Sequence, residues 1–258
     1  MMDVPSESTP HCAIPFNCGM RTSECGLKNP SNSAIRTPQS ALHSLRTPHS
    51  EVAVVDYGMG NLRSVAKALE RVGAKVSVTS DPDEIRASRK IVLPGVGAFA
   101  DAVKELKSRD LWDLLKGEIE RGKPYLGICL GLQLLFTVSF EDGEHSGMGL
   151  LPGKVIRFPE PAPDVTSGPR LKVPHIGWNQ IHRLREPPLL VDVPEGSYFY
   201  FVHSYYVLPD DSQVTAATTR YGTDFVSMVW RQNLFGTQFH PEKSQKWGLK
   251  IMENFHRL

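Results

Sequence analysis

The sequence predicts an α/β protein with a central, mostly parallel sheet flanked by helices and a second half richer in strands. Short, wholly apolar segments such as Val52–Val55 alternate with segments of helical spacing in the first half. Segments that are apolar on both faces are typical of parallel strands covered by helices. From residue 154 onward, β-branched and aromatic segments separated by short polar breaks replace most of the helical patterns.

The first half contains four predicted strands joined by helical crossovers. After the strand Val52–Val55, a helix presents Leu62, Val65, Leu69 and Val72 on one stripe and ends at Gly73. Crossover helices between parallel strands place ligand sites at the carboxyl ends of those strands. The remaining elements of this half are a strand that begins with Val76 and Val78, strands at residues 91–93 and 125–128, and a helical pattern at residues 111–115.

The second half contains six predicted strands and a closing helix. The helix carries Trp247, Ile251, Phe255 and Leu258 at helical spacing, which indicates packing against the core. Residues 159–170 are rich in proline and predict an exposed loop. The strands are expected at residues 154–158, 175–181, 198–207, 214–219, 225–231 and 234–240.

Cys129 follows an apolar stretch and precedes a run of helical character that extends to Phe136. Gly127 and Gly131 allow the backbone to turn sharply between a strand and a helix, as in a nucleophile elbow. A sulfur at the start of a helix is stabilised as the thiolate by the helix dipole and by unpaired N–H groups. Cys129 is therefore a candidate nucleophile, and the alternative is a buried structural cysteine.

A His-Pro-Glu motif, His240-Pro241-Glu242, follows the last apolar segment. Residues two apart in an extended chain point to the same side, so His240 and Glu242 face one site if the strand continues through Pro241. Proline also disfavours helical backbone at the residue before it. A carboxylate beside an imidazole orients the ring and stabilises its charged form. With Cys129 the motif predicts a Cys-His-Glu relay, and by itself it also fits a strand-ending turn with a solvated acid.

The loop Pro94-Gly95-Val96-Gly97 follows the strand at residues 91–93. Its glycines let backbone N–H groups turn toward an approaching ligand. The N–H near Val96 and the N–H of Leu130, directly after the candidate nucleophile, would together form an oxyanion hole. The alternative is an ordinary turn between a strand and a helix.

The segment Gly127-Ile128-Cys129-Leu130-Gly131-Leu132-Gln133 and the distant His240-Pro241-Glu242 resemble the class I (triad) glutamine amidotransferase family. Residues 56–62, 94–99 and 172–179 narrow the resemblance to the glutaminase subunits of imidazole glycerol phosphate synthase, an enzyme of histidine biosynthesis. The similarity covers roughly residues 51–258. It implies the flavodoxin-like amidotransferase fold, hydrolysis of glutamine by the Cys129, His240 and Glu242 triad, and no metal or organic cofactor.

The resemblance also assigns residues that would hold the substrate. Glutamine would be bound by the loop glycines Gly95 and Gly97, by Gln133, and by the segment His203-Ser204-Tyr205. For Gln133 and for this segment, packing in a helix or a sheet is the alternative. His203, His175 and His182 are expected to be structural rather than catalytic.

The partner implied by the resemblance is a cyclase subunit with a (β/α)8 barrel, which forms a heterodimer with the glutaminase and receives its ammonia. The cyclase would make imidazole glycerol phosphate and an aminoimidazole carboxamide ribonucleotide. Asn61, Trp178, Tyr200 and Lys243 would lie at the interface, and Trp178 would fit the core equally well.

Two other functions are compatible with the same fold. A glutaminase subunit of another synthase, such as anthranilate or carbamoyl phosphate synthase, would have the same triad and a different partner. A binding module on the same fold would not use Cys129 for catalysis at all.

Composition limits the other classes of function. The 258 residues carry a net charge of +1 and no apolar run near the ~18 residues of a membrane span, so neither a nucleic acid nor a membrane partner is expected. Four cysteines in a chain of this length do not predict a disulfide framework, and a catalytic thiol suits the reducing cytoplasm.

Residues 1–50 differ in composition from the amidotransferase-like region at residues 51–258. They are rich in Ser, Thr, Pro and Asn, which predicts a disordered extension. Cys12, Cys18 and Cys25 are spaced unlike a zinc knuckle. A targeting segment and a start codon placed too far upstream are the alternatives to a disordered tail.

Overall fold

The computed structural model of the chain describes residues 50–159 and 172–258. The predicted disordered extension therefore lies outside the described residues apart from Ser50. The predicted proline-rich loop lies outside them apart from Pro159.

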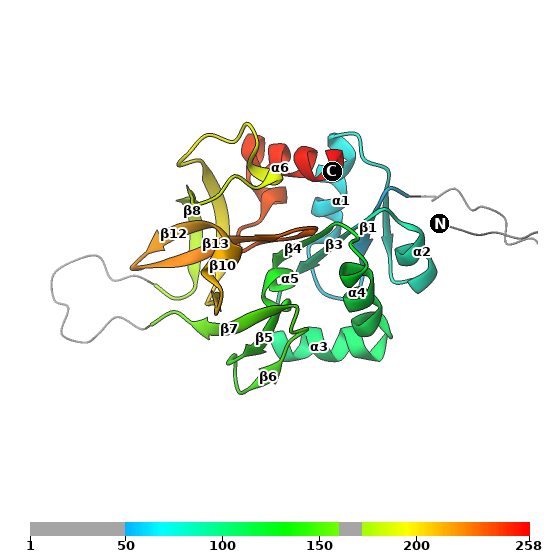
Figure 1. Ribbon diagram of the computed structural model, residues 1–258, viewed down its shortest axis with the longest axis horizontal. Coiled ribbons are helices and arrows are strands. Elements are labelled where there is room, and N and C mark those ends of the chain that lie inside the picture. Colours follow the sequence, from blue (N-terminus) through cyan, green and yellow to red (C-terminus); the bar gives the residue numbers. More distant parts are fainter. Residues whose placement is uncertain (1–49, 160–171) are drawn as a thin grey trace, which may run out of the picture. The chain divides into compact units, whose positions relative to one another are not determined.

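An eight-stranded mixed sheet forms the centre of the described fold, with the strand order β2-β1-β3-β4-β14-β13-β12-β9 (Figure 1). Strands β1, β2, β3, β4 and β14 run parallel, and β13, β12 and β9 extend the sheet in antiparallel pairs. The strands are β1 Val52–Val55, β2 Val76–Thr79, β3 Lys90–Gly95, β4 Tyr125–Cys129, β9 His182–Arg183, β12 Thr215–Tyr221, β13 Thr223–Arg231 and β14 Leu234–Thr237.

Two smaller sheets stand beside the central sheet. One is an antiparallel pair of β8 and β10, and the other has the order β11-β7-β5-β6. Their strands are β5 Phe136–Ser139, β6 His145–Ser146, β7 Leu151–Arg157, β8 His175–Gln180, β10 Tyr198–His203 and β11 Tyr205–Pro209.

Helices cover both faces of the parallel strands. Alternate residues of one strand point to opposite faces, so Val52 and Val54 pack in the cluster that contains α1 and α6, whereas Ala53 and Val55 pack in the cluster that contains α3 and α4. The predicted α/β class is thereby confirmed. The helices are α1 Leu62–Arg71, α2 Pro82–Ala87, α3 Phe99–Ser108, α4 Leu111–Glu120, α5 Leu130–Gln133 and α6 Gln245–Arg257, with one-turn 3-10 helices η1 Pro188–Leu190, η2 Ser212–Val214 and η3 Pro241–Lys243. None of the helices in the described ranges is long and apolar enough to cross a membrane.

Several element boundaries differ from the sequence-based expectations, and three of the differences affect the region around Cys129 and His240. The helix after Cys129 ends at Gln133 instead of reaching Phe136. From Leu134 onward, the backbone carbonyl groups accept hydrogen bonds from residues 148–151, which lead into β7. The expected strand at residues 198–207 is two strands that enter different sheets and meet at Ser204. Strand β14 ends at Thr237, before His240. The short strands β5 and β6 and the helices α2 and α3 were not individually expected.

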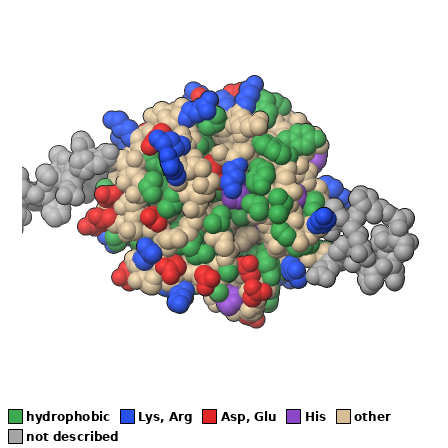
Figure 2. All heavy atoms as spheres, turned by 180° about the vertical axis from the view of Figure 1, so that it is seen from behind, with side chains coloured by type: hydrophobic (Ala, Val, Ile, Leu, Met, Phe, Trp, Pro, Cys, Tyr) green, Lys and Arg blue, Asp and Glu red, His purple; other side chains and the backbone are tan. Residues whose placement is uncertain are grey.

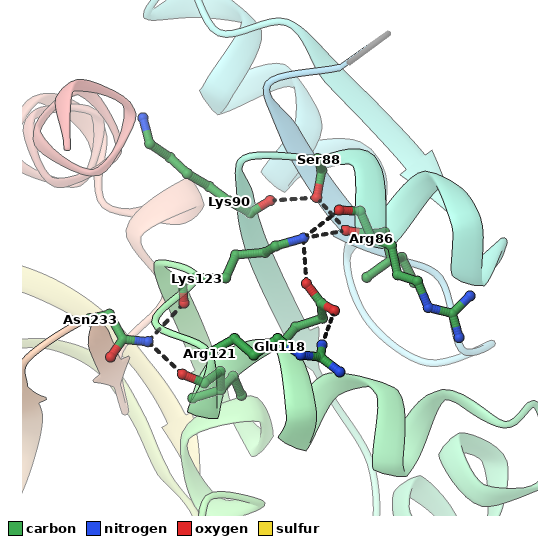
Figure 3. Close-up of polar contacts among 9 residues, drawn as sticks. Arg86, Ser88, Lys90, Glu118, Arg121, Lys123 and Asn233 are labelled. Atoms are coloured by element: carbon green, nitrogen blue, oxygen red, sulfur yellow. Dashed lines mark hydrogen bonds and ion pairs between the residues drawn. The ribbon is translucent and has the colours of Figure 1, made fainter. Parts of the chain in front are cut away.

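A cluster of charged and polar groups joins the elements at the amino ends of β3 and β4, opposite the end that carries Cys129 (Figure 3). Lys123 Nζ donates to the carbonyl oxygens of Ile85 (2.9 Å) and Arg86 (2.8 Å) at the end of α2. It also lies 2.7 Å from Glu118 Oε2 on α4, and Arg121 pairs with the other oxygen of the same carboxylate. Lys123 therefore ties the end of α2 to α4 just before β4 begins.

Replacing Lys123 with methionine is expected to lower the free energy of unfolding by about 3 kcal/mol, because the side chains of both Lys123 and Glu118 are largely buried and Glu118 loses a partner. Urea denaturation followed by circular dichroism measures the effect. Lys67→Met, which breaks an exposed ion pair with Glu70, is the matched control and should change stability by less than about 0.5 kcal/mol. Equal effects of the two variants would contradict the role given to Lys123.

Candidate active site

Cys129 lies at the carboxyl end of β4 in a sharp turn into α5. Its backbone has φ 55° and ψ −105°, in the positive-φ region that L residues rarely adopt. Glycines on both sides make the turn possible: a Cβ at Gly131 would overlap the carbonyl oxygen of Leu93, and a Cβ at Gly127 would overlap that of Gly131. The turn is the elbow that the sequence predicts. Helix α5 has only four residues, so the helix dipole acting on the sulfur is weaker than expected.

His240 and Glu242 meet in the turn that follows β14. His240 Nδ1 lies 2.9 Å from Glu242 Oε1, and the two side chains are 2% and 1% exposed. His240 is extended, at φ −101° and ψ 96°, as a residue before proline should be. The chain then turns through η3 instead of continuing as a strand. The turn, rather than the alternation of an extended chain, therefore brings the two side chains together.

The environment of His240 favours the imidazolium. Its second ring nitrogen, Nε2, is buried and makes no conventional hydrogen bond within the described residues. Burial alone would lower the pKa of His240, but the negative charge of the Cys129 sulfur, with help from Glu242, outweighs burial and raises the pKa to about 10. His240 therefore holds a proton beside the sulfur at neutral pH.

Three further groups surround the sulfur of Cys129. Val202 O lies 3.9 Å from Sγ, and Gln238 Nε2 lies 3.6 Å from it. The Tyr57 hydroxyl is buried without a partner in the described part of the chain. Burial and then the charge of Cys129 raise the pKa of Tyr57, which keeps its hydroxyl protonated.

Cys129 opens into a cavity of about 400 Å³. Gly95 does not line it but packs beneath, where an added Cβ would lie 2.6 Å from Tyr57 Oη and 2.7 Å from Leu130 Cβ. Most of the residues expected to form the oxyanion hole or bind substrate do line the cavity, namely Val96, Gly97, Leu130, Gln133, His203, Ser204 and Tyr205.

Glu141 also lines the cavity, although it was not among the residues expected at the site. Its carboxylate accepts a hydrogen bond of 2.8 Å from Phe99 N, at the start of α3. Burial raises the pKa of Glu141, and the bond from Phe99 opposes that rise. No local motif marks this acid, which belongs to the turn between the short strands β5 and β6, neither of which was expected.

His203 contributes to the cavity wall, but its ring is engaged in a chain of hydrogen bonds within the protein. Nδ1 donates to Tyr205 O at 2.8 Å, and Nε2 lies 3.2 Å from His175 Nδ1, whose Nε2 lies 3.3 Å from Asn179 Nδ2. Burial lowers the pKa of His203 to about 3 and that of His175 to about 4. Both rings are therefore neutral at pH 7. His182 lies on β9, with an exposed side chain 3.4 Å from Glu195.

Three of the four expected interface residues lie together on the surface, and one of them, Lys243, also lines the cavity. Trp178 and Tyr200 pair across β8 and β10, with ring centroids 6.1 Å apart, and the Lys243 ammonium lies 5.7 Å from the centre of the Tyr200 ring. Asn61 is at the start of α1, a helix that contacts the η3 turn carrying Lys243. Trp178 is 46% exposed, so it is not a core residue.

The fold and the family comparison define the class of protein. Residues 53–257 match the family "Glutamine amidotransferase class-I". The solved structure of PurLQS from Thermotoga maritima, 21% identical, has a similar fold, with a TM-score of 0.58 over 79% of this chain and 96% of that chain. The chain therefore belongs to the class I glutamine amidotransferase family.

Relatives of higher identity specify which amidotransferase the chain resembles. The imidazole glycerol phosphate synthase subunit HisH of Geobacter sulfurreducens is 50% identical over 81% of this chain and 99% of its own length. The protein of the same name from Syntrophotalea carbinolica is 51% identical over 79% of this chain and 98% of its own length. Within its family, the chain thus groups with the HisH subunits, and the predicted resemblance is confirmed.

Proposed function

We propose that the chain hydrolyses glutamine to glutamate and ammonia at Cys129 and delivers the ammonia to a cyclase subunit of imidazole glycerol phosphate synthase, in histidine biosynthesis. The observation that carries the proposal is that Cys129, which lines the cavity, is in side-chain contact with buried His240, whose Nδ1 lies 2.9 Å from Glu242 Oε1. The close relationship to HisH subunits favours this synthase over one that makes anthranilate or carbamoyl phosphate.

The first half of the reaction forms a thioester. The Cys129 thiolate attacks the side-chain carbonyl carbon of glutamine, and the carbonyl oxygen becomes an oxyanion. The N–H groups near Val96 and at Leu130 stabilise that charge, and each such donor contributes about 3 kcal/mol to lowering the barrier. The His240 imidazolium then gives its proton to the departing nitrogen as the C–N bond breaks, and ammonia leaves.

The second half of the reaction releases glutamate. His240, now neutral, takes a proton from water, and the resulting hydroxide attacks the thioester carbonyl. The C–S bond breaks, Cys129 leaves as the thiolate, and His240 is again an imidazolium. Glu242 keeps the Nδ1 proton of His240 in place, so Nε2 faces the reacting atoms throughout.

Two side chains of the cavity would recognise the substrate. Glu141 offers a carboxylate to the α-ammonium group of glutamine. Gln133 Nε2 already donates to Tyr205 O (3.1 Å) and to Gln238 Oε1 (3.2 Å), so both of its hydrogens are used. Its remaining group, Oε1, is an acceptor suited to the N–H groups of the substrate amide. This pattern selects the amide of glutamine over the carboxylate of glutamate.

Ammonia in water at neutral pH is mostly protonated and no longer a nucleophile, so the product must pass directly to the enzyme that uses it. We therefore assign Trp178, Tyr200 and Lys243 to a surface that docks a (β/α)8 cyclase subunit in a heterodimer. Exposed aromatic side chains are typical anchors of such interfaces. On the face shown in Figure 2, hydrophobic side chains gather across the middle and one side, and acidic side chains lie along the lower edge. A reactive thiol is best kept in a reducing compartment, which supports the cytoplasm as the proposed location of this complex.

Glutamate release by the purified full chain, measured alone and then with the cyclase and its nucleotide substrate, tests this function. We expect slow hydrolysis by the chain alone and strong stimulation by the partner. Trp178→Ala should weaken association with the cyclase about tenfold or more, whereas Val78→Ala, on the far edge strand β2, should leave it unchanged. Equal rates with and without the cyclase would overturn the coupling, and no hydrolysis under either condition would overturn the proposed activity.

A further inference from the structure

Gln238 lies beside the nucleophile, and the mechanism described above uses it only as an acceptor for Gln133. It follows β14 and is 0% exposed. Its backbone N–H donates to Ser227 O at 2.9 Å, which holds it against β13. Its side chain extends to the sulfur of Cys129, where Nε2 lies 3.6 Å from Sγ. A buried amide in contact with a reacting atom is an unusual placement for a purely structural residue.

A chain of hydrogen bonds determines which end of the Gln238 amide faces the sulfur. Tyr205 O is a carbonyl oxygen and only accepts, so the group of Gln133 that meets it at 3.1 Å is the NH₂ group. The second hydrogen of that NH₂ group reaches Gln238 at 3.2 Å, and Gln238 must present Oε1 to accept it. The NH₂ group of Gln238 is thereby directed toward Cys129.

The contact distinguishes the two protonation states of the sulfur. An amide N–H stabilises a thiolate more strongly than a neutral thiol, because hydrogen bonds to charged acceptors are about twice as strong as neutral ones. The S–H of the neutral thiol has its own acceptor in Val202 O, 3.9 Å away. Gln238 therefore acts on the thiolate and Val202 on the thiol.

We propose that Gln238 is a catalytic residue of this site, whose side-chain N–H donates a hydrogen bond that stabilises the Cys129 thiolate. Gln133 orients the donor, so the cavity wall at Tyr205 and the nucleophile belong to one hydrogen-bonded chain. The inference rests on the proposed function, because it takes Cys129 as the nucleophile.

Other groups around the sulfur also influence its charge. His240 faces it from the turn after β14 with Glu242 behind, and Tyr57 lies near it from the loop after β1. Glu141 and Lys243 line the cavity more distantly. Gln238 carries no charge at any pH, so replacing it leaves all of these titrating groups in place.

The pH dependence of Cys129 alkylation by iodoacetamide tests the inference on the full chain. Mass spectrometry of the digest gives the rate at Cys129 separately from those at Cys12, Cys18 and Cys25, which serve as internal references. Gln238→Met, of similar length but without a donor, should move the midpoint of the Cys129 profile upward by about one pH unit, a tenfold loss of thiolate below the midpoint. At pH values below the midpoint, the kcat for glutamine should fall about tenfold as well, with KM changed less than about twofold, because Gln238 does not line the cavity and Tyr205 O still holds Gln133.

Thr237→Val is the matched control. It removes a buried hydroxyl, bonded to Phe239 O at 3.0 Å, from the residue next to Gln238, and it should leave the Cys129 profile unchanged. An unchanged profile in Gln238→Met would overturn the inference and leave the proposed function standing. Failure of Cys129 to react with the alkylator in the wild-type chain would instead overturn the function itself.

If Gln238→Met does not fold, a measurement on the wild-type chain tests the same hydrogen bond. In a ¹⁵N-glutamine-labelled sample, the side-chain amide proton of Gln238 should shift with pH in step with the alkylation profile of Cys129. The shift should vanish in Cys129→Ala, in which the sulfur is gone. A Gln238 amide signal that does not respond to pH would overturn the inference.

Discussion

Replacing Cys129 with alanine is expected to lower the rate of glutamine hydrolysis at least about 10³-fold, because the covalent route through the thioester is lost. The fold should persist, since alanine fills most of the space of this small buried side chain. Glutamate release in the presence of the cyclase measures the loss, and circular dichroism checks the fold.

A chain in which Cys12, Cys18 and Cys25 are all replaced by alanine is the matched control, because it removes three thiols and keeps Cys129. It should hydrolyse glutamine at the wild-type rate, and a glutamine-analogue alkylator should label it once. Persistent hydrolysis in Cys129→Ala would show that Cys129 is not the nucleophile and would favour the binding-module alternative.

Replacing Glu242 with glutamine is expected to lower kcat by about 10³-fold while KM changes little. The amide is nearly the same size, but it lacks the charge that supports the His240 imidazolium 2.9 Å away. Glu242 helps to raise the pKa of His240 to about 10, so its loss should lower that pKa. The high-pH limb of the kcat/KM profile should therefore move to lower pH, because His240 must be protonated to release ammonia.

Glu70→Gln, which changes an exposed acid of α1, should leave kcat and the pH profile as they are. Initial rates of glutamate release between pH 6 and 10 compare the two variants. If Glu242→Gln retained the wild-type profile, the carboxylate would have no part in holding the proton on His240.

Sequence patterns predicted the elements that depend on neighbouring residues. The apolar run at Val52–Val55 and the amphipathic helix after it are local signals, and both appear in the structure. The turn at Cys129 is local as well, because glycines two residues to either side are what allow it. The helix expected from Leu130 to Phe136 begins as predicted, but its end was predicted wrongly: the apolar residues there fit a buried helix and a buried strand equally, and Phe136 instead pairs with β7 as the start of β5.

Contacts between distant segments were not predictable in the same way. Nothing near Glu141 marks it as part of the cavity, and nothing near Gln238 indicates that its amide meets a sulfur. The break at Ser204 also has no strong local signal, because β10 and β11 are both rich in aromatic residues. Each of these features follows from which strands lie side by side.

The sequence by itself determined the alternation of strands and helices, the sharp turn at Cys129 and the chemical identity of the reacting groups, because these depend on side-chain type and on spacings of a few residues. Only the tertiary structure decided that β14 lies beside β4. This pairing brings His240 and Gln238 to the sulfur and lets Gln133 hydrogen-bond to Gln238. The physical reason is that strand order is set by the burial of whole faces of the sheet, and no short stretch of chain contains that information.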